Sequence, residues 1–453
     1  MKAFKAYDIR GIYGEDITCD LAYQVGRCLP TLLDTQDILV GRDMRLSSND
    51  LSEALITGIC EAGANAWDLG LATTPMVYFF TAEGAHNTTF GGSVMVTASH
   101  NPKEYNGLKV SKAGARPCGY HLGLSDIEAQ IESGNLPPKQ HPGTRHNLPL
   151  CKAYVAWLKA HTPPFDNLRF AVDCSDGAAG ILARDLFGPH AIYLNETPDG
   201  AFPHHGPNPL EPANREALRQ TVLENHLDFG ILFDGDADRV AFIDNLGNFV
   251  PPDAMIPLFA RRLGQCGDVV VHDVRTSRGV IETLREDGFS PLMVKVGAAF
   301  AKTALRQQNG ICGGEVAGHY YFRNFHWCDS GEFAACQALG ILSEAKLHGQ
   351  TLADLLAPIT SRYYASGEVN LHHIGNRPAA IQAVEAALLE KWGAPAQRID
   401  FDGVRLDWPN AWFGVRASNT EPILRLAGEA KTREHLAEML AIASRAGDAF
   451  RSE

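Results

Sequence analysis

Apolar runs that end in an aspartate at a turn recur three times along this chain. They are Ile38-Leu39-Val40-Gly41-Arg42-Asp43, Phe170-Ala171-Val172-Asp173 and Val269-Val270-Val271-His272-Asp273. Each run is typical of a buried strand, and an aspartate after it is typical of a turn. The pattern predicts three strands in equivalent positions of a repeated unit. Strands that end in aspartate are common, so chance similarity is the alternative.

Segments with helical patterning lie between these strands. Residues 51–62, 213–224 and 255–263 carry apolar side chains at helical spacing. Strands that alternate with helices are typical of parallel or mixed sheets covered by helices. We therefore expect an α/β protein with three related mixed α/β domains.

The C-terminal part of the chain has a different pattern. Residues 381–392 are predicted to form a helix, and residues 412–426 to form strands around a polar loop, as in a smaller α+β domain. A polar and proline-rich segment at 133–142 is the expected linker after the first domain, and further boundaries are expected near 250–252 and around 361–369. The predicted domains span residues 1–145, 146–250, 251–363 and 364–453.

Length and charge narrow the classes of partner. The chain has 453 residues and a formal net charge of -13, without a cluster of lysines and arginines, so we expect no nucleic-acid partner. We also expect no membrane span, because no apolar stretch is long enough. Ten cysteines without a C-x-x-C pair, and a start that lacks a secretory pattern, favour a cytoplasmic location.

A serine on a turn is the first candidate for chemistry. Ser99 follows the apolar run Val94-Met95-Val96 within Thr97-Ala98-Ser99-His100-Asn101-Pro102. His100 and Asn101 offer hydrogen-bond donors to a phosphoryl group on this serine, and Lys109 is close enough in sequence to reach the same turn. The alternatives are a turn or helix-capping serine and a solvated lysine.

Three carboxylates on alternate residues are the second candidate. Asp234, Asp236 and Asp238 follow the apolar run Ile231-Leu232-Phe233 and offer the oxygen ligands that Mg²⁺ prefers. An EF-hand is excluded because Arg239 and Asn245 stand where it needs glycine and glutamate. A dehalogenase-type phosphatase with Asp234 as nucleophile, and a solvated acidic turn paired with Arg239, are the alternatives.

Two further loops carry polar groups. Arg416, Ser418, Asn419 and Thr420, with Arg425, offer guanidinium, hydroxyl, amide and backbone donors suited to a phosphate, although a capped polar turn is the alternative. The glycine-rich segment 313–319 carries Glu315, which can accept hydrogen bonds from a diol, and His319, which could equally be a core histidine.

In this order, these motifs resemble those of the α-D-phosphohexomutases, and most closely the bacterial phosphomannomutase and phosphoglucomutase branch. The resemblance extends from Ala6-Tyr7-Asp8-Ile9-Arg10-Gly11 to Arg425 and so covers nearly the whole chain. It implies four domains around one cleft, and interconversion of hexose 6-phosphates and 1-phosphates, mannose first, through a hexose 1,6-bisphosphate. Glucose or dual specificity is the first alternative; a glucosamine phosphate mutase, a phosphatase and a silent phosphosugar-binding protein are further ones.

The resemblance also assigns roles to residues. It implies that Ser99 carries the phosphoryl group and joins the three aspartates as a Mg²⁺ ligand. Its catalytic candidates are Ser99, His100, Lys109, Arg10 and His319. Its substrate-binding candidates are Tyr7, Asn101, Arg239, Arg275, Glu315, Arg416, Ser418, Asn419, Thr420 and Arg425.

Two positions depart from the family pattern. Ala317 stands where family members commonly have serine. Where they commonly have Thr-Gly-His, this chain has Val296-Gly297-Ala298. The departures leave the phosphoryl-transfer residues in place and make the sugar preference an open question. We expect small hexose phosphates as the partners of a monomer or weak homo-oligomer.

Overall fold

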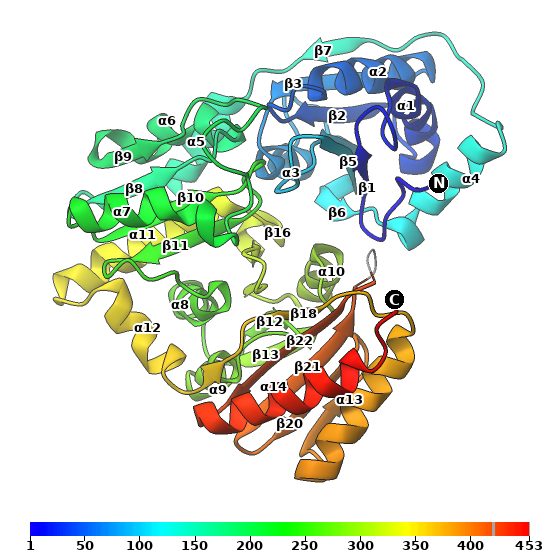
Figure 1. The fold of residues 1–453 in the computed structure, drawn as a ribbon. Helices are drawn as coiled ribbons and strands as arrows, with labels where there is room; N and C mark the ends of the chain where they lie inside the picture. Colours follow the sequence, from blue (N-terminus) through cyan, green and yellow to red (C-terminus); the bar gives the residue numbers. More distant parts are fainter. Residues whose placement is uncertain (419–421, 453) are drawn as a thin grey trace.

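Three of the β-sheets share one strand topology. The computed structural model describes residues 1–418 and 422–452, and these form four sheets, arranged in chain order from blue to red in Figure 1. In each of the first three sheets, three parallel strands lie in the order third, first, second, and an antiparallel strand pairs with the third. The prediction of three related mixed α/β domains is confirmed.

The first domain has the largest sheet, in the order β1-β5-β4-β2-β3-β7, with β6 beside β5. Its elements are β1 (Ile9–Ile12), α1 (Cys19–Leu33), β2 (Asp37–Arg42), α2 (Ser48–Glu61), β3 (Asn65–Leu71), α3 (Thr74–Glu83), β4 (Gly92–Val96), β5 (Tyr105–Lys112), β6 (Arg116–Pro117), α4 (Leu124–Glu132) and β7 (Arg145–Asn147). The predicted linker 133–142 joins α4 to β7. The predicted boundary after residue 145 falls within β7 and stays a prediction.

The second and third domains have smaller sheets, in the orders β11-β10-β8-β9 and β13-β12-β14-β15-β16. The second contains α5 (Cys151–Ala160), β8 (Phe170–Asp173), α6 (Ala183–Phe187), β9 (Ala191–Leu194), α7 (Glu216–Glu224), β10 (Phe229–Phe233) and β11 (Val240–Asp244). The third contains α8 (Ile256–Leu263), β12 (Val269–Asp273), α9 (Arg278–Glu286), β13 (Ser290–Val294), α10 (Ala298–Gln308), β14 (Cys312–Gly314), β15 (Tyr320–Phe322), β16 (Cys328–Asp329), α11 (Gly331–Leu347) and α12 (Leu352–Thr360).

The C-terminal domain is an antiparallel sheet with two helices packed on it. Its elements are β17 (Tyr364–Ala365), β18 (Val369–Leu371), α13 (Arg377–Trp392), β19 (Gln397–Ile399), β20 (Val404–Trp408), β21 (Ala411–Ala417), β22 (Leu424–Ala430) and α14 (Arg433–Asp448). Both α13 and α14 lie across one face of this sheet (Figure 1). The predicted α+β character of this domain is confirmed.

Helix starts differ from the sequence expectation where local capping decides them. The segment 213–224 becomes α-helical only at Glu216, because Pro212–Arg215 forms a tighter 3-10 turn. The helix predicted from residue 381 begins earlier, at Arg377, because the Asn376 side chain accepts a hydrogen bond from the Ala379 N–H and caps the helix. Caps of this kind extend a helix beyond its apolar pattern.

The three aspartates of the repeated pattern play one structural part. Asp43, Asp173 and Asp273 each accept a hydrogen bond from the backbone N–H two residues later, at 3.0, 2.9 and 2.6 Å. They follow or end β2, β8 and β12, the first parallel strand of each repeat. An aspartate that caps its own turn in this way ends the strand and directs the chain across the sheet edge.

One hydrophobic core joins the first three domains, and a second core belongs to the C-terminal domain. In the joint core, Phe325 packs against Phe79 of α3, Trp157 of α5 and Phe333 of α11, with ring centroids 5.7–6.1 Å apart. The C-terminal core is built from its own sheet and helices, including Phe413 of β21. The first three domains therefore pack as one body to which the fourth is attached.

We predict that Phe325→Ala lowers the free energy of unfolding by about 3–5 kcal/mol, because it opens a cavity where three domains meet. Chemical denaturation followed by tryptophan fluorescence measures the loss. Leu246→Ala is the control, since Leu246 is 63% exposed and should change stability by less than about 0.5 kcal/mol. Equal effects of the two variants would contradict the joint core.

Candidate functional site

Equivalent loops of the three repeats carry three of the four groups of predicted site residues. Ser99 lies between β4 and β5, the aspartate cluster between β10 and β11, and Glu315 and His319 between β14 and β15. Each loop joins the third parallel strand of its domain to the antiparallel strand. The shared topology therefore delivers one loop from each domain to a common place.

The Ser99 turn is held in an unusual backbone conformation. Ser99 has φ +52°, in the left-handed region that costs a non-glycine residue conformational energy. The Thr97 hydroxyl accepts a hydrogen bond from the Ser99 N–H at 2.8 Å and donates one to Asp43 at 2.7 Å. Arg45 donates to the Ser99 carbonyl at 2.8 Å and to the Asn101 carbonyl at 2.6 Å. The repeat aspartate and Arg45 thus fix the direction of the serine.

The serine lies against the acidic cluster. The Ser99 hydroxyl donates to Asp234 Oδ2 at 2.6 Å, although the two residues are far apart in sequence. Asp234, Asp236 and Asp238 are all buried, and one ligand oxygen from each lies within 4.8 Å of the others. Burial and the charges of Asp236 and Asp238 raise the pKa of Asp234 well above its usual range. The three buried carboxylates therefore need positive charge close to them.

The cluster suits a divalent cation. Asp236 Oδ1 and Asp238 Oδ1 are buried without a hydrogen-bond partner among the described residues. Buried carboxylate oxygens left in this way are costly unless a cation balances them, and three carboxylates are the hard ligands that such a cation prefers. These residues therefore fit a metal ion.

Lys109 supplies positive charge to the same cluster. Its ammonium group donates to Asp236 Oδ2 at 2.6 Å and to Asp238 Oδ2 at 2.5 Å. Burial acts to lower the pKa of Lys109, but the two carboxylates outweigh it and raise the pKa. Thr74 of α3, which the sequence did not single out, donates to Asp236 Oδ2 at 2.5 Å.

Two more predicted residues flank the serine. Arg10 donates to Asn101 Oδ1 at 2.8 Å and pairs with Asp8, which orients its guanidinium beside the turn. The His100 Nδ1 atom is 3.4 Å from the Ser99 hydroxyl. Burial, with the charges of Arg239 and Arg10, holds the pKa of His100 well below its usual range, so this imidazole is neutral.

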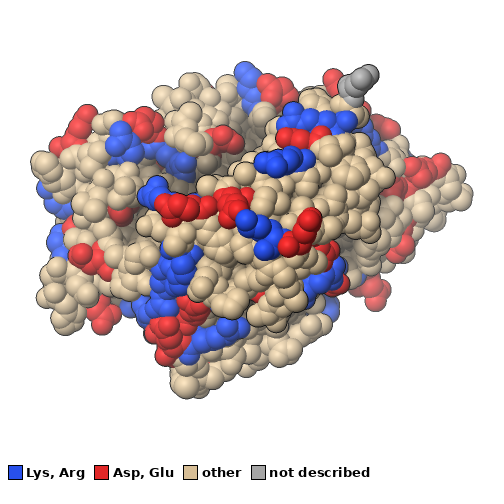
Figure 2. All heavy atoms as spheres, turned by 60° about the horizontal axis from the view of Figure 1, so that its bottom comes forward, with Lys and Arg blue, Asp and Glu red and all other residues tan. Residues whose placement is uncertain are grey.

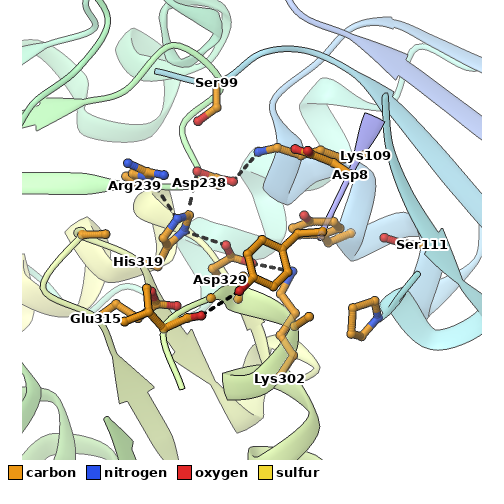
Figure 3. A pocket seen from close by; sticks show the side chains of 18 of the residues that line it. Asp8, Ser99, Lys109, Ser111, Asp238, Arg239, Lys302, Glu315, His319 and Asp329 are labelled. Carbon is orange, nitrogen blue, oxygen red and sulfur yellow. Dashed lines mark hydrogen bonds and ion pairs between the residues drawn. The ribbon is translucent and has the colours of Figure 1, made fainter. Parts of the chain in front are cut away.

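His319 lies at the centre of a chain of charged side chains (Figure 3). Arg239 Nε donates to His319 Nε2 at 2.9 Å, and His319 Nδ1 is 2.8 Å from Asp329 Oδ2. Asp329 also pairs with Lys302 of α10 at 2.6 Å. Burial acts to raise the pKa of Asp329, but Lys302 and His319 outweigh it and lower the pKa. Because Nε2 accepts the hydrogen bond from Arg239, the proton of His319 lies on Nδ1, the nitrogen that faces Asp329.

Glu315 is held beside this chain. Tyr321 of β15 donates to Glu315 Oε1 at 2.5 Å, and Arg275 lies 3.8 Å from Glu315 Oε2. Arg275 in turn pairs with the repeat aspartate Asp273 at 2.7 Å, which also accepts from the Val316 N–H at 3.2 Å. The third repeat therefore uses its turn aspartate to position the loop as the first repeat does.

Half of the predicted site residues line a cavity of about 320 Å³. The cavity is also lined by Ala298 and Ala317, the two departures from the family pattern, and by Lys302 and Asp329. The described residues that line it come from the first three domains. The predicted residues among them are Tyr7, Arg10, Ser99, Lys109, Asp238, Arg239, Arg275, Glu315 and His319.

The arginines of the C-terminal domain lie at a neighbouring hollow. Arg416 and Arg425 line it together with Arg275, which also lines the main cavity. Ser418 is buried at the end of the same hairpin, and its N–H donates to the Ile423 carbonyl at 2.9 Å. Asn419 and Thr420 lie outside the described residues.

Sequence reasoning missed Arg45, Thr74, Lys302 and Asp329 as site residues. Lys302 is a helical residue, and the only local sign of its role is a charged side chain on a face that is otherwise apolar. Asp329 ends the short strand β16 and precedes the capping residue Ser330, an arrangement similar to that of the turn aspartates of the repeats. The sequence contained that signal, but short strands are difficult to recognise.

Charge is mixed on the face of the molecule drawn in Figure 2. Lysine and arginine side chains are interspersed there with aspartate and glutamate. In the described part of the chain, none of the helices combines the length and apolar character needed to cross a bilayer.

Family models match the chain in four successive segments. They describe the α/β/α domains I, II and III of phosphoglucomutase/phosphomannomutase, over residues 1–136, 152–247 and 251–363, and its C-terminal domain, over residues 375–445. The chain therefore belongs to the phosphoglucomutase/phosphomannomutase family, which confirms the resemblance seen in the motifs. Its activity class is that of the phosphohexomutases, enzymes that move a phosphoryl group within a substrate.

Individual relatives agree with this placement. The chain is 36% identical over 450 residues to the phosphomannomutase of Salmonella montevideo, and 35% identical over 440 residues to phosphohexose mutases of Xanthomonas campestris pv. campestris, with 95% of both chains covered in each case. A crystal structure of a phosphoglucomutase/phosphomannomutase family protein from Burkholderia thailandensis superimposes with a TM-score of 0.87, at 28% identity, over 99% of this chain and 97% of that one.

We predict that Asp236→Asn weakens Mg²⁺ or Mn²⁺ binding at least about 100-fold, because loss of a charged ligand should exceed the loss of an outer-sphere partner. Isothermal titration calorimetry measures the dissociation constant. Asp228→Asn, at a carboxylate outside the cluster that pairs with Lys346, should bind the metal as the wild type does. Unchanged affinity in Asp236→Asn would show that the cluster is not the metal site.

Proposed function

We propose that this protein interconverts mannose 6-phosphate and mannose 1-phosphate, with Ser99 as the carrier of the phosphoryl group and Mg²⁺ as the metal. The observation that carries the proposal is the 2.6 Å contact between the Ser99 hydroxyl, which lines the cavity, and Asp234 of the acidic cluster beside it. A serine held against a metal site can pass a phosphoryl group back and forth, since positioning and charge neutralisation carry most of this chemistry.

The phosphoryl transfer balances within the enzyme and its substrate. The free hydroxyl of the bound hexose phosphate attacks the phosphorus of phospho-Ser99, the bond from phosphorus to Ser99 Oγ breaks, and a hexose 1,6-bisphosphate results. The attacking hydroxyl gives its proton to a base on the enzyme, and Ser99 Oγ leaves with the electron pair of its bond to phosphorus and takes up a proton. The bisphosphate then reverses its orientation in the site, and the reverse step transfers its other phosphoryl group to Ser99.

The aspartates Asp234, Asp236 and Asp238 would hold Mg²⁺, with an oxygen at Ser99 as a further ligand. Mg²⁺ bound there supplies positive charge that offsets the charge developing on the transferred phosphoryl group. Arg10 and Asn101, beside the turn, can donate to phosphoryl oxygens. Arg45 and Asp43 already fix the turn around Ser99. The turn therefore need not rearrange when Ser99 carries the phosphoryl group.

Two residues are the candidates for proton transfer. His319 Nδ1 faces Asp329 and Nε2 accepts a hydrogen bond from Arg239, so Nε2 is the nitrogen that takes up a proton when Arg239 moves from it to substrate. Lys109 is the second candidate, and in this arrangement its ammonium is engaged by two carboxylates. Glu315 is placed to accept hydrogen bonds from sugar hydroxyls.

The non-reacting phosphate, at the far end of the substrate, would be bound by Arg416 and Arg425, with Ser418, Asn419 and Thr420 of the same loop. Of these, the described residues Arg416, Ser418 and Arg425 lie in the C-terminal domain, apart from the metal cluster. A substrate that presents either of its two ends to Ser99 needs such a second phosphate site, because the non-reacting phosphate must be held in both orientations. Arg275 joins this site to the main cavity.

The full-length similarity to phosphomannomutases supports mannose as the sugar. Ala298 and Ala317 make the sugar side of the cavity less polar, which favours tolerance toward more than one hexose over strict selection. Glucose phosphates are therefore the second candidate substrates. A cytoplasmic location and a monomeric or weakly oligomeric state stay predictions from the sequence.

We predict that Ser99→Ala lowers mutase turnover more than about 1,000-fold, because the group that accepts and returns the phosphoryl moiety is gone. Turnover is measured with mannose 1-phosphate, Mg²⁺ and catalytic hexose 1,6-bisphosphate. Intact-mass analysis of the wild type should also show acid-stable phosphate on Ser99. Ser133→Ala, in the linker, is the control. An acid-labile phosphate on Asp234 would instead support the phosphatase alternative.

We predict that kcat/KM falls in the order mannose, glucose and glucosamine 1-phosphate, with at least about a tenfold difference between the first and the last. Adding a polar group by Ala317→Ser should widen the gap between mannose and glucose, because the two sugars differ in the direction of one hydroxyl. Steady-state kinetics with all three substrates measure both effects. A preference for glucosamine 1-phosphate would overturn mannose specificity.

A further inference from the structure

The carboxylate of Asp402, in the fourth domain, contacts the third domain at the edge of the cavity. Asp402 lies on the turn between β19 and β20. Its Oδ2 atom accepts a hydrogen bond from the Val296 N–H at 2.8 Å, and its Oδ1 atom accepts one from Arg416 Nε at 3.2 Å. Its side chain is 21% exposed. Asp402 thus contacts both a segment that lines the main cavity and Arg416 of the β21–β22 hairpin. We call this hairpin the phosphate hairpin, because it carries Arg416 and Arg425.

The first domain also holds the backbone of Val296, through the carbonyl of this residue. Tyr7 donates its hydroxyl proton to the Val296 carbonyl at 3.0 Å, and its ring packs edge-on against Phe300. Gly297 has φ +129°, and a Cβ there would lie 2.7 Å from the Tyr7 ring. Glycine is therefore needed for this close approach. Three domains therefore meet at the backbone of one residue, Val296, beside the cavity.

The register of the phosphate hairpin explains why Arg416 needs a carboxylate. Arg416 of β21 and Arg425 of β22 are direct cross-strand partners, and like charges in that position repel. Glu368 pairs with Arg425 at 3.1 Å, and Asp402 provides the matching contact for Arg416. Gly403 lets the turn lie against β21, because a Cβ there would be 2.2 Å from the Val415 carbonyl.

The contact uses only part of the guanidinium. Arg416 donates a hydrogen bond to Asp402 through Nε, and its two terminal amino groups take no part in that hydrogen bond. A guanidinium has five N–H donors in a fixed plane, so a carboxylate at Nε fixes the plane while the amino groups can serve a second anion. This geometry is that of a support for phosphate binding rather than a competitor with phosphate.

We propose that Asp402 is a positioning residue that sets Arg416 for the substrate phosphate and ties it to the sugar-lining segment at Val296. The proposal rests on the proposed function, because it takes Arg416 as a ligand of the non-reacting phosphate. Through the two oxygens of Asp402, movement of the C-terminal domain is transmitted to the segment that precedes Ala298. Phosphate binding and the shape of the sugar cavity are therefore coupled.

Two variants separate the two arms of this contact. Asp402→Asn keeps an oxygen that accepts from the Val296 N–H, but its amide group cannot accept from Arg416 Nε. Asp402→Ala removes both contacts. Asp400→Asn is the matched control, since Asp400 lies on the same turn, is 68% exposed and pairs with Arg398 at 2.6 Å.

We expect Asp402→Asn to raise the KM for mannose 1-phosphate and the inhibition constant of inorganic phosphate about fivefold, with kcat changed less than about twofold, because a substrate-binding contact is misplaced. Asp402→Ala should raise KM further and also lower kcat, because the sugar-lining segment is released. Asp400→Asn should match the wild type in all three constants.

Each other result overturns the proposal. A lower KM and a lower inhibition constant in Asp402→Asn would make Asp402 a competitor of phosphate, and constants equal to those of Asp400→Asn would give it no part in binding. If Asp402→Ala does not fold, the isosteric Asp402→Asn decides alone. Failure of the proposed function is separately visible, since the wild type would then not turn over hexose phosphates.

Discussion

The negative charge of three buried aspartates is the constraint on which the rest of the site depends. Asp234, Asp236 and Asp238 share a volume small enough for one ion, and Asp236 and Asp238 each have a buried oxygen without a hydrogen-bond partner among the described residues. Lys109 approaches from the first domain and the Ser99 hydroxyl donates to the cluster. The first two domains are therefore held together at their functional edge by electrostatics, as well as by the shared aromatic core behind it.

Repetition of one small topology brings the site together. Each of the first three domains places a functional loop between its third parallel strand and its antiparallel strand, and ends its first strand with an aspartate that caps a turn. In the first and third domains that aspartate also steadies the functional loop, through Thr97 and through Val316. The fourth domain has a different topology, an antiparallel sheet with its own core.

Local sequence predicted the elements better than it predicted their partners. The strands that end at Asp43, Asp173 and Asp273 were found because buried strands leave a continuous apolar run. Helix starts at Glu216 and Arg377 were missed because a 3-10 turn and an asparagine cap, rather than periodicity, decide them. Lys302 and Asp329 were not predicted as site residues, since their ion pair joins a helix to a short strand and neither shows its role alone.

The sequence by itself determined the domain types and the chemistry of each loop, because apolar periodicity and the choice of hydroxyl, carboxylate and guanidinium groups are local properties. Only the tertiary structure decided which groups act together. The contacts from Ser99 to Asp234, from His319 to Asp329 and from Asp402 to Val296 and Arg416 all cross long stretches of chain. Such contacts depend on how sheets and domains pack, because the burial that gives them their strength exists only once the domains have come together.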